Sequence, residues 1–167
     1  MDIKIREWQQ DDVASLAKVA NNAEIAANLR DVFPNPYTKK DAEFFIALAA
    51  QADKNFILMY AIEIDGKAVG SISVSLIDEH NTKSGEIGFW LGKKYWNKGY
   101  MTEAIKQVSA LAFKKFDIIR IDADVFEHNT ASRVALQNAG FVWEGTMRKA
   151  IFKDGKYLDK CIYGLLK

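Results

Sequence analysis

The chain has 167 residues, of which 49% are apolar and 27% charged, and its formal net charge is +1. This length suits one domain spanning 1–167, and the near-neutral charge argues against a surface that binds nucleic acid or membranes as a whole. The N-terminal sequence lacks the apolar core of a signal peptide, and no apolar run is long enough to span a bilayer. The single cysteine, Cys161, excludes an internal disulfide and fits a reducing compartment, so we expect a cytoplasmic protein.

The first part of the chain predicts one short strand and two helices. Residues 3–8 are typical of a strand, and residues 13–20 carry apolar side chains at i, i+3, i+4 and i+7, the stripe of an amphipathic helix. The segment 33–37 contains both prolines and must be extended or turning, because a proline moves the residue before it out of the helical region. Thr38, with Asp41 three residues later, resembles a capping box that opens a second helix.

From residue 56 the apolar pattern changes to that of strands. Such patterns predict strands at 56–64, 72–76, 86–91 and 118–126. Asp65-Gly66 is a hairpin turn signal between the first two of them. The helix that follows Gly99 has an apolar stripe that includes Leu111. In the strand predicted at 118–126, Ile119 is one of the alternating apolar positions.

The end of the chain predicts a short helix and a hairpin. Asn129 is a good N-cap for a helix that ends at Gly140, and Asp154-Gly155 joins two final strands. The resulting order, β-α-α-β-β-β-α-β-α-β-β, predicts an α/β (α+β) fold with a central, mixed, mostly antiparallel sheet of about seven strands and helices on both faces. The strands 86–91 and 118–126, with the helix between them, form a βαβ unit, so these two strands should be parallel.

The start of the helix after Gly99 is the first candidate site. A helix N-terminus carries unpaired backbone N–H groups and the positive end of the helix dipole, so it attracts phosphate groups. The segment supplies a glycine for close backbone approach, the cation of Lys98 and the hydroxyl of Thr102. It has no glycine-rich GK[ST] run, which excludes a Walker loop, and an ordinary turn before a helix is the alternative.

Glu86 is the second candidate, as a general base. A period of two places it on one strand face together with Gly88 and Trp90. A carboxylate beside a glycine gap in a cleft can accept a proton from a substrate. A solvated residue at the sheet edge is the alternative.

Further candidates lie at a helix start and in an irregular segment. Asn129 and Ser132 are one turn apart, where they cap the helix or hold an amide-bearing ligand. The segment between the first two helices carries recognition candidates, with surface filler as the alternative: Arg30, Asp31, Phe33 and Tyr37. His80, His128 and Cys161 are too few and too scattered to form a metal site, so no metal is expected.

Three stretches of sequence carry a family resemblance. They are Glu86-Ile87-Gly88-Phe89-Trp90-Leu91, then Tyr95-Trp96-Asn97-Lys98-Gly99-Tyr100-Met101-Thr102-Glu103-Ala104, and the tail Gly140-Phe141…Glu144-Gly145…Asp154-Gly155…Asp159…Tyr163. In combination they resemble the GNAT superfamily of N-acetyltransferases, and within it the RimJ/RimL type, which includes the ribosomal-protein N-terminal alanine acetyltransferases. The likeness covers nearly the whole chain, and it implies the GNAT fold and acetyl-coenzyme A as the acetyl donor.

The resemblance also implies roles for the matching residues. Backbone amides would hold the coenzyme pyrophosphate at Asn97, Lys98, Gly99, Tyr100, Met101 and Thr102. The strand at Trp90 and Leu91 would pair with the pantetheine amides, and the Trp90 N–H would meet the thioester oxygen, where negative charge develops. Asn129 would bind the pantetheine arm, and Glu86 falls where many members place a general base.

The coenzyme loop and the acid position depart from the family pattern. Trp96 replaces the Gln or Arg that opens the loop, and Met101 replaces the Gly or Ala that closes it. Leu136 stands where many members have a tyrosine that protonates the departing thiolate. Ser132 is the nearest replacement, as a donor to the sulfur, and Tyr163 is another. Departure without a protein acid is the third alternative, because a thiol pKa near 8.5 makes the thiolate a fair leaving group.

We therefore expect direct acetyl transfer in a ternary complex to a primary amine, with a protein N-terminal α-amino group as the acceptor. At pH 7 an α-amino group with a pKa of about 8 is neutral in roughly one molecule in ten, whereas an alkylamine with a pKa near 10.4 is neutral in about one in a few thousand. Acetylation of an N-terminus therefore depends less on Glu86 as a general base. The alternatives are a small amine, such as a polyamine, amino acid or antibiotic, and a non-catalytic acyl-coenzyme A-binding module. No nucleic-acid or membrane partner is expected, and a homodimer stays open.

Overall fold

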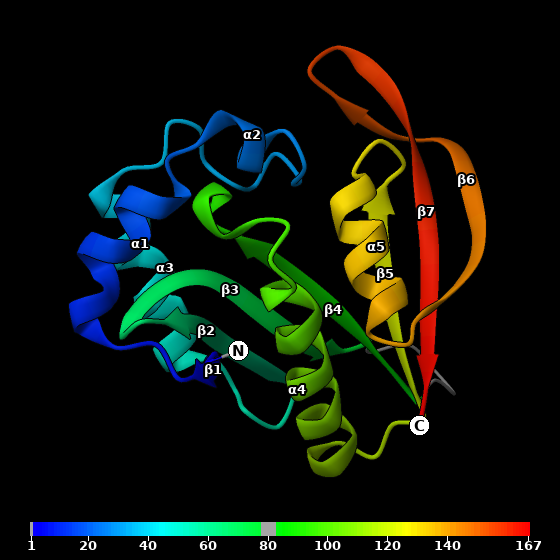
Figure 1. The fold of residues 1–167 in the computed structure, drawn as a ribbon, viewed down its shortest axis with the longest axis horizontal. Helices are drawn as coiled ribbons and strands as arrows, with labels where there is room; N and C mark the ends of the chain where they lie inside the picture. Colours follow the sequence, from blue (N-terminus) through cyan, green and yellow to red (C-terminus); the bar gives the residue numbers. More distant parts are fainter. Residues whose placement is uncertain (1, 78–82) are drawn as a thin grey trace.

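The computed structural model describes residues 2–77 and 83–167, so His80 lies outside the described residues. The strands form one seven-stranded sheet in the order β1-β2-β3-β4-β5-β7-β6 (Figure 1). The strands are β1 (Lys4–Arg6), β2 (Ile57–Ile64), β3 (Lys67–Leu76), β4 (Ser84–Leu91), β5 (Arg120–Phe126), β6 (Val142–Lys153) and β7 (Lys156–Leu166). The helices are η1 (Gln10–Asp12), α1 (Val13–Ala20), α2 (Ala23–Ala26), α3 (Lys39–Gln51), η2 (Lys93–Tyr95), α4 (Tyr100–Lys115) and α5 (Thr130–Asn138).

The order of elements confirms the predicted one, with short helices in addition. Helix α2 is capped by Asn22, whose side-chain oxygen accepts hydrogen bonds from the N–H groups of Glu24 at 2.9 Å and Ile25 at 3.2 Å. This helix has 4 residues, too few for an apolar stripe to repeat, so periodicity could not predict it. The 3-10 helices η1 and η2 are 3 residues each and escape prediction for the same reason.

The predicted caps and turns begin and end the elements. Thr38 and Asp41 form the capping box at the start of α3. In the turn Asp65-Gly66 both residues have positive φ, 51° and 72°, as the tight hairpin between β2 and β3 requires. The same geometry at Asp154-Gly155, with φ of 49° and 73°, joins β6 to β7. These local signals therefore determine the element boundaries without help from distant residues.

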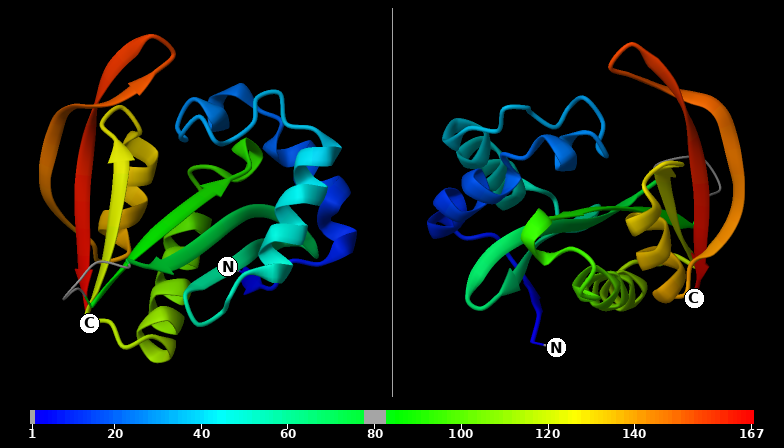
Figure 2. Two further views of the ribbon diagram at one scale, coloured as in Figure 1. Left: turned by 180° about the vertical axis from the view of Figure 1, so that it is seen from behind. Right: turned by 45° about the horizontal axis from the view of Figure 1, so that its top comes forward.

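The sheet opens between β4 and β5. These two strands are parallel, as the βαβ pattern predicted, and they pair only through residues 84–86 with 120–122. Beyond those pairs, β4 continues to Leu91 and β5 to Phe126, and the two strands diverge (Figure 2, left). Backbone groups on the facing edges are thus left for a ligand to pair with, since buried N–H and C=O groups need partners.

Helices cover both faces of the sheet (Figure 2, right). Helices α4 and α5 contribute to the main core, which includes Ile87 and Leu91 of β4. On the other face, α1 and α3 form a smaller cluster against which Trp90 packs. The predicted alternation along β4 is confirmed, and it places Glu86 on the face of Trp90.

Two apolar residues lie outside the core that the pattern predicted for them. Leu111 is 41% exposed, because it sits at the edge of the α4 stripe rather than at its centre. Ile119 is 60% exposed, because β5 begins one residue later, at Arg120. The backbone N–H of Ile119 instead bonds to the carbonyl of Lys83 at 2.9 Å.

Gly70 of β3 lies where the neighbouring strand leaves no room for a side chain. A Cβ there would be 2.5 Å from the Trp90 carbonyl oxygen and 3.0 Å from the Leu91 side chain. We expect Gly70→Ala to lower the free energy of unfolding by about 1–3 kcal/mol, because the oxygen cannot yield without separating β3 from β4. Urea unfolding should show a lower midpoint with an unchanged slope.

The matched control is Gly145→Ala in β6, where an added Cβ meets nothing within 4 Å. It should change the free energy of unfolding by no more than about 0.5 kcal/mol. Equal stability of the two variants would contradict the role assigned to Gly70.

Candidate functional site

An open groove of about 270 Å³ lies on the face of the sheet that carries Glu86. It is lined by Arg30, Ile77, Glu86, Asp122, Ala123, Asp124, Lys160 and Ile162. Glu86 pairs with Asp122 in the parallel ladder, which is the last pair before the two strands diverge. The predicted general base therefore stands in the groove, at the point where the sheet opens.

Four charged side chains meet in this groove. The Nη2 atom of Arg30 lies 3.3 Å from Oε1 of Glu86 and 3.0 Å from Oδ2 of Asp124. The Nζ atom of Lys160 lies 3.2 Å from the same Oδ2 atom. Asp124 is the more enclosed acid, with a side chain 17% exposed against 43% for Glu86. Arg30 thus pairs with both carboxylates, and Lys160 pairs with Asp124.

The environment moves the two carboxyl groups in opposite directions. Burial raises the pKa of Glu86 above its ordinary value, and the negative charge of Asp124 raises it further, against the opposing effect of Arg30. Burial would also raise the pKa of Asp124, but Arg30 and Lys160 outweigh it and hold that pKa below its usual range. Asp124 therefore stays charged, and Glu86 is the group suited to exchange a proton.

We expect Asp124→Asn to lower the pKa of Glu86 toward its ordinary value. The charge of Asp124 disfavours the ionised form of Glu86, so its removal makes ionisation easier. A carbon-13 NMR titration of the Glu86 carboxyl measures the change. Asp117→Asn, which removes a fully exposed charge outside the groove, should leave the titration unchanged. An upward shift in Asp124→Asn would contradict the expected coupling.

Asp124 and Lys160 were missed by the sequence-based prediction of the site. The signal for Asp124 was present, because the period of two in β5 places Asp122 and Asp124 on one face, and the predicted parallel pairing puts that face beside Glu86. Nothing in the sequence near Lys160 indicates this site, since β7 reaches it only by pairing with β5.

The loop before α4 has the backbone geometry of an anion site. Asn97 and Gly99 have positive φ, 58° and 78°, and both residues are exposed. Gly99 is the N-cap of α4 and has no side chain to cap the helix. The first N–H groups of the helix can therefore donate hydrogen bonds to a ligand. Trp96, which departs from the family pattern, donates its indole N–H to the carbonyl of Leu91 at 2.7 Å. This bond holds the loop against the end of β4.

The start of α5 lies at the same end of the sheet as the start of α4 (Figure 1). The side-chain oxygen of Asn129 accepts a hydrogen bond from the N–H of Ser132 at 3.2 Å, which confirms the predicted cap. Leu136 is fully buried in the main core, and the Tyr163 hydroxyl, also buried, accepts a hydrogen bond from Nε of Arg133 at 3.1 Å. Half-buried Ser132 is therefore the least enclosed of the hydroxyl groups considered for the leaving sulfur.

The predicted recognition segment divides between the groove and the core. Arg30 reaches the groove, and Asp31 bonds to the buried Lys153 of β6 at 2.8 Å. The ring of Phe33 contacts Trp90 edge-to-face with centroids 5.6 Å apart. Tyr37 is 6% exposed and packs in the smaller core cluster, where burial raises its pKa to about 12. The segment is thus held by the Asp31–Lys153 ion pair and by the packing of Phe33 and Tyr37, and it presents Arg30 to the site.

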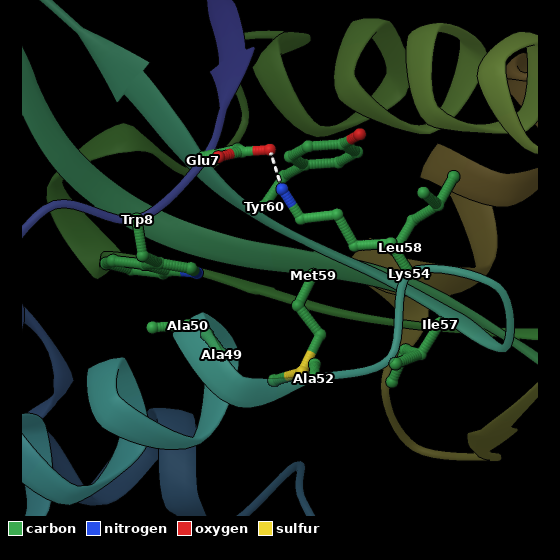
Figure 3. A pocket seen from close by; sticks show the side chains of 10 residues that line it. All are labelled: Glu7, Trp8, Ala49, Ala50, Ala52, Lys54, Ile57, Leu58, Met59 and Tyr60. Atoms are coloured by element: carbon green, nitrogen blue, oxygen red, sulfur yellow. Dashed lines mark hydrogen bonds and ion pairs between the residues drawn. The ribbon is translucent and has the colours of Figure 1, made fainter.

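A second cavity, of about 160 Å³, lies between the end of α3 and strand β2 (Figure 3). Glu7 and Lys54 form an ion pair at this cavity, and Trp8, Met59 and Tyr60 contribute to its lining. None of the residues predicted for the site lines it. Within residues 2–77 and 83–167, no cluster of potential metal ligands is found, and no helix is long and apolar enough to cross a membrane.

The curated proteins that are similar in sequence to this chain include two relatives named for ribosomal acetylation. YdaF of Bacillus subtilis, a putative ribosomal N-acetyltransferase, is 33% identical over 103 residues, which cover 62% of this chain and 56% of that protein. The ribosomal-protein-serine acetyltransferase of Escherichia coli is 28% identical over 111 residues, which cover 66% of this chain and 61% of that protein. The chain therefore spans less than two thirds of the length of these relatives.

The fold and the family model agree with this similarity. RimJ of Mycobacterium smegmatis, solved in complex with CoA-disulfide, has a TM-score of 0.87 and 22% identity, covering 98% of this chain and 81% of that one. At this identity the likeness shows a shared fold. The model of the acetyltransferase (GNAT) domain matches residues 2–142, most of the sequence. The chain therefore belongs to the GNAT acetyltransferase domain family, as its motifs predicted.

Proposed function

We propose that this protein transfers the acetyl group of acetyl-coenzyme A to a primary amine, and that the amine is a protein N-terminal α-amino group. One observation carries the proposal: the Glu86 carboxyl, whose pKa is raised, stands in an open groove where β4 and β5 diverge. A base with a pKa moved toward neutral pH is suited to take a proton from an amine. We further propose that residues 1–167 act as one N-acetyltransferase domain, because one continuous sheet runs from β1 to β6.

The start of α4 fits the diphosphate of the acetyl donor. The uncapped N-terminus of α4, with positive φ at Asn97 and Gly99, offers backbone N–H groups to a diphosphate, and Lys98 adds a cation. The predicted pyrophosphate segment ends at Met101 and Thr102 in the first turn of α4. Thus a glycine at the N-cap suffices for close approach, although Met101 replaces the small residue of the family pattern.

The pantetheine arm would lie along the diverging edge of β4. Trp90 and Leu91 lie beyond the last β4–β5 pair, so their backbone is placed to bond its amides. The Leu91 carbonyl is held by Trp96. As the family resemblance implies, the N–H of Trp90 is the donor proposed for the thioester oxygen. Asn129 uses its side-chain oxygen as a cap, so its side-chain amide group is the part proposed to bind the arm.

The proposed reaction proceeds by direct attack in a ternary complex. The nitrogen lone pair of the neutral amine forms a bond to the acetyl carbon, and the carbon–sulfur bond breaks. An acceptor that binds as an ammonium first loses one proton to solvent, and Glu86 accepts the second proton, which the nitrogen loses as it is acylated. The coenzyme leaves as a thiolate, and Ser132 is placed to donate a hydrogen bond to its sulfur, because the tyrosine position of the family is taken by the buried Leu136.

The charges of the groove favour an acceptor that carries one positive charge. Glu86 and Asp124 face Lys160, whereas Asp122 is bound by Arg120 at 2.5 Å. A polyamine, with several ammonium groups, calls for more unpaired carboxylates than this groove supplies. The names of the ribosomal relatives agree with a protein acceptor.

A thiol-release assay with acetyl-coenzyme A tests the proposal. The acceptors are short peptides with Ala, Ser or Met at the N-terminus, polyamines, free amino acids and aminoglycosides. We expect turnover on the peptides and none on their N-acetylated forms. Turnover on a small amine alone would replace the N-terminal acceptor, and tight coenzyme binding without turnover on any amine would identify a non-catalytic binding module.

A further inference from the structure

Arg30 bonds to the carboxylates of the groove through a single nitrogen atom, Nη2. Its Nη2 lies 3.3 Å from Oε1 of Glu86, and 3.2 Å and 3.0 Å from the two carboxylate oxygens of Asp124. The side-chain hydrogen bonds and ion pairs that Arg30 makes with Glu86 and Asp124 all pass through this atom. One nitrogen is therefore surrounded by three carboxylate oxygens that belong to two different strands.

This arrangement differs from two arginine–carboxylate pairs elsewhere in the described residues, each of which uses two nitrogens. Arg6 binds Asp12 through Nη1 at 2.7 Å and Nη2 at 2.8 Å, the two-pronged geometry that suits a guanidinium. Arg120 binds Glu144 in the same way, at 2.8 Å and 2.6 Å. In contrast, Nη2 of Arg30 has two hydrogens for three oxygens.

A primary ammonium group matches this set of acceptors better. It carries three N–H donors on one nitrogen, which is one donor for each oxygen that surrounds Nη2. We infer that Arg30 is an internal placeholder for the acceptor: its Nη2 occupies the position that the acceptor's ammonium nitrogen takes between Glu86 and Asp124, and the acceptor binds by displacing the Arg30 side chain. This inference rests on the proposed acetyl transfer to a primary amine, and it makes Asp124 the residue that positions the ammonium.

The charges of the groove agree with this exchange. Without Arg30, the groups facing each other are the carboxylates of Glu86 and Asp124 and the cation of Lys160, 3.2 Å from Asp124. Their sum is one negative charge, which one ammonium balances. The Arg30 side chain and an ammonium acceptor thus carry the same charge. They cannot occupy the site together, because two positive charges at one position repel each other.

The Arg30 side chain can leave while its loop stays in place. The side chain is 64% exposed, and ion pairs of exposed groups are weak. The loop itself is held by other residues, through the contact of Phe33 with Trp90 and the bond from Lys153 to Asp31. Displacement therefore costs only the weak ion pairs of one exposed side chain.

The test compares Arg30→Met with Lys160→Met in steady-state kinetics with a peptide amine that turns over. Both variants remove one positive charge from the groove, but only the first removes the group that fills the ammonium position. For Arg30→Met we expect KM for the amine to fall about two- to fivefold, with KM for acetyl-coenzyme A unchanged, in line with the strength of an exposed ion pair. For Lys160→Met we expect no fall in KM, because Arg30 then holds Asp124 without a competitor.

Two results would overturn the placeholder role. An unchanged or higher KM in Arg30→Met would mean that Arg30 does not compete with the acceptor or helps to bind it. An equal fall in both variants would mean that the loss of positive charge alone attracts the ammonium.

A binding measurement separates this inference from the proposed function. If no amine turns over, calorimetric titration of L-alaninamide, in the presence of coenzyme A, measures the same competition without chemistry. Tighter binding to Arg30→Met than to the parent protein would support the placeholder while rejecting acetyl transfer. Equal binding would reject the placeholder as well. Turnover with no change of KM in Arg30→Met would reject the placeholder and leave acetyl transfer intact.

Discussion

We expect Glu86→Gln to lower kcat for a peptide amine roughly 100-fold at pH 7, with little change in affinity for acetyl-coenzyme A. Glutamine keeps the size of the side chain but cannot accept a proton. The coenzyme contacts proposed for Asn97 to Thr102 and for Asn129 do not involve Glu86, so the binding of the donor should persist. Steady-state kinetics, together with a calorimetric titration of acetyl-coenzyme A, measures both quantities.

The pH dependence of this effect gives a sharper test. An α-amino group with a pKa of about 8 is mostly neutral at pH 9, so less of the rate depends on a protein base there. The ratio of the two kcat values should therefore shrink between pH 7 and pH 9. Glu43→Gln, which changes an exposed glutamate on α3 that pairs with Lys39, is the matched control and should keep the parent kcat. Equal kcat in Glu86→Gln and the parent protein across this range would remove Glu86 from the chemistry.

Substitution of Gly99 should weaken coenzyme binding as well as the fold. Gly99 has φ of +78° at the N-cap of α4, a conformation that costs an L-residue about 1–2 kcal/mol. Alanine there strains the turn that orients the first N–H groups of α4, which are the groups proposed to bind the pyrophosphate. We expect Gly99→Ala to raise Kd for acetyl-coenzyme A by roughly tenfold, as measured by calorimetry.

Gly66 provides the control for backbone strain. It has φ of +72° in the β2–β3 turn, and an added Cβ meets nothing within 4 Å. The same strain should lower the Tm of both Gly99→Ala and Gly66→Ala by roughly 2–8 °C, but Gly66→Ala should not change the affinity for the coenzyme. If both variants bind acetyl-coenzyme A as the parent protein does, the N-terminus of α4 is not the pyrophosphate site.

The features that the sequence predicted are those with a short physical range. A capping box joins Thr38 to Asp41 within one turn, and the Asp65-Gly66 hairpin needs only its own backbone conformation. The face on which Glu86 lies follows from the period of a strand and needs no knowledge of the partner strands. An error occurred where a pattern ended, at Ile119, because the apolar alternation extends one residue before the start of β5 at Arg120.

The sequence by itself thus determined the order of the elements, the buried faces of β4 and α4, and the uncapped helix start at Gly99. Only the tertiary structure decided which charges meet in the groove. Arg30 and Asp124 are 94 residues apart, and nothing local relates them. Their contact depends on the pairing of β4 with β5 and on the packing of Phe33 against Trp90, which carries the loop of Arg30 over the sheet. Periodicity and caps describe how a segment folds, whereas the charge balance of a site depends on how distant segments pack together.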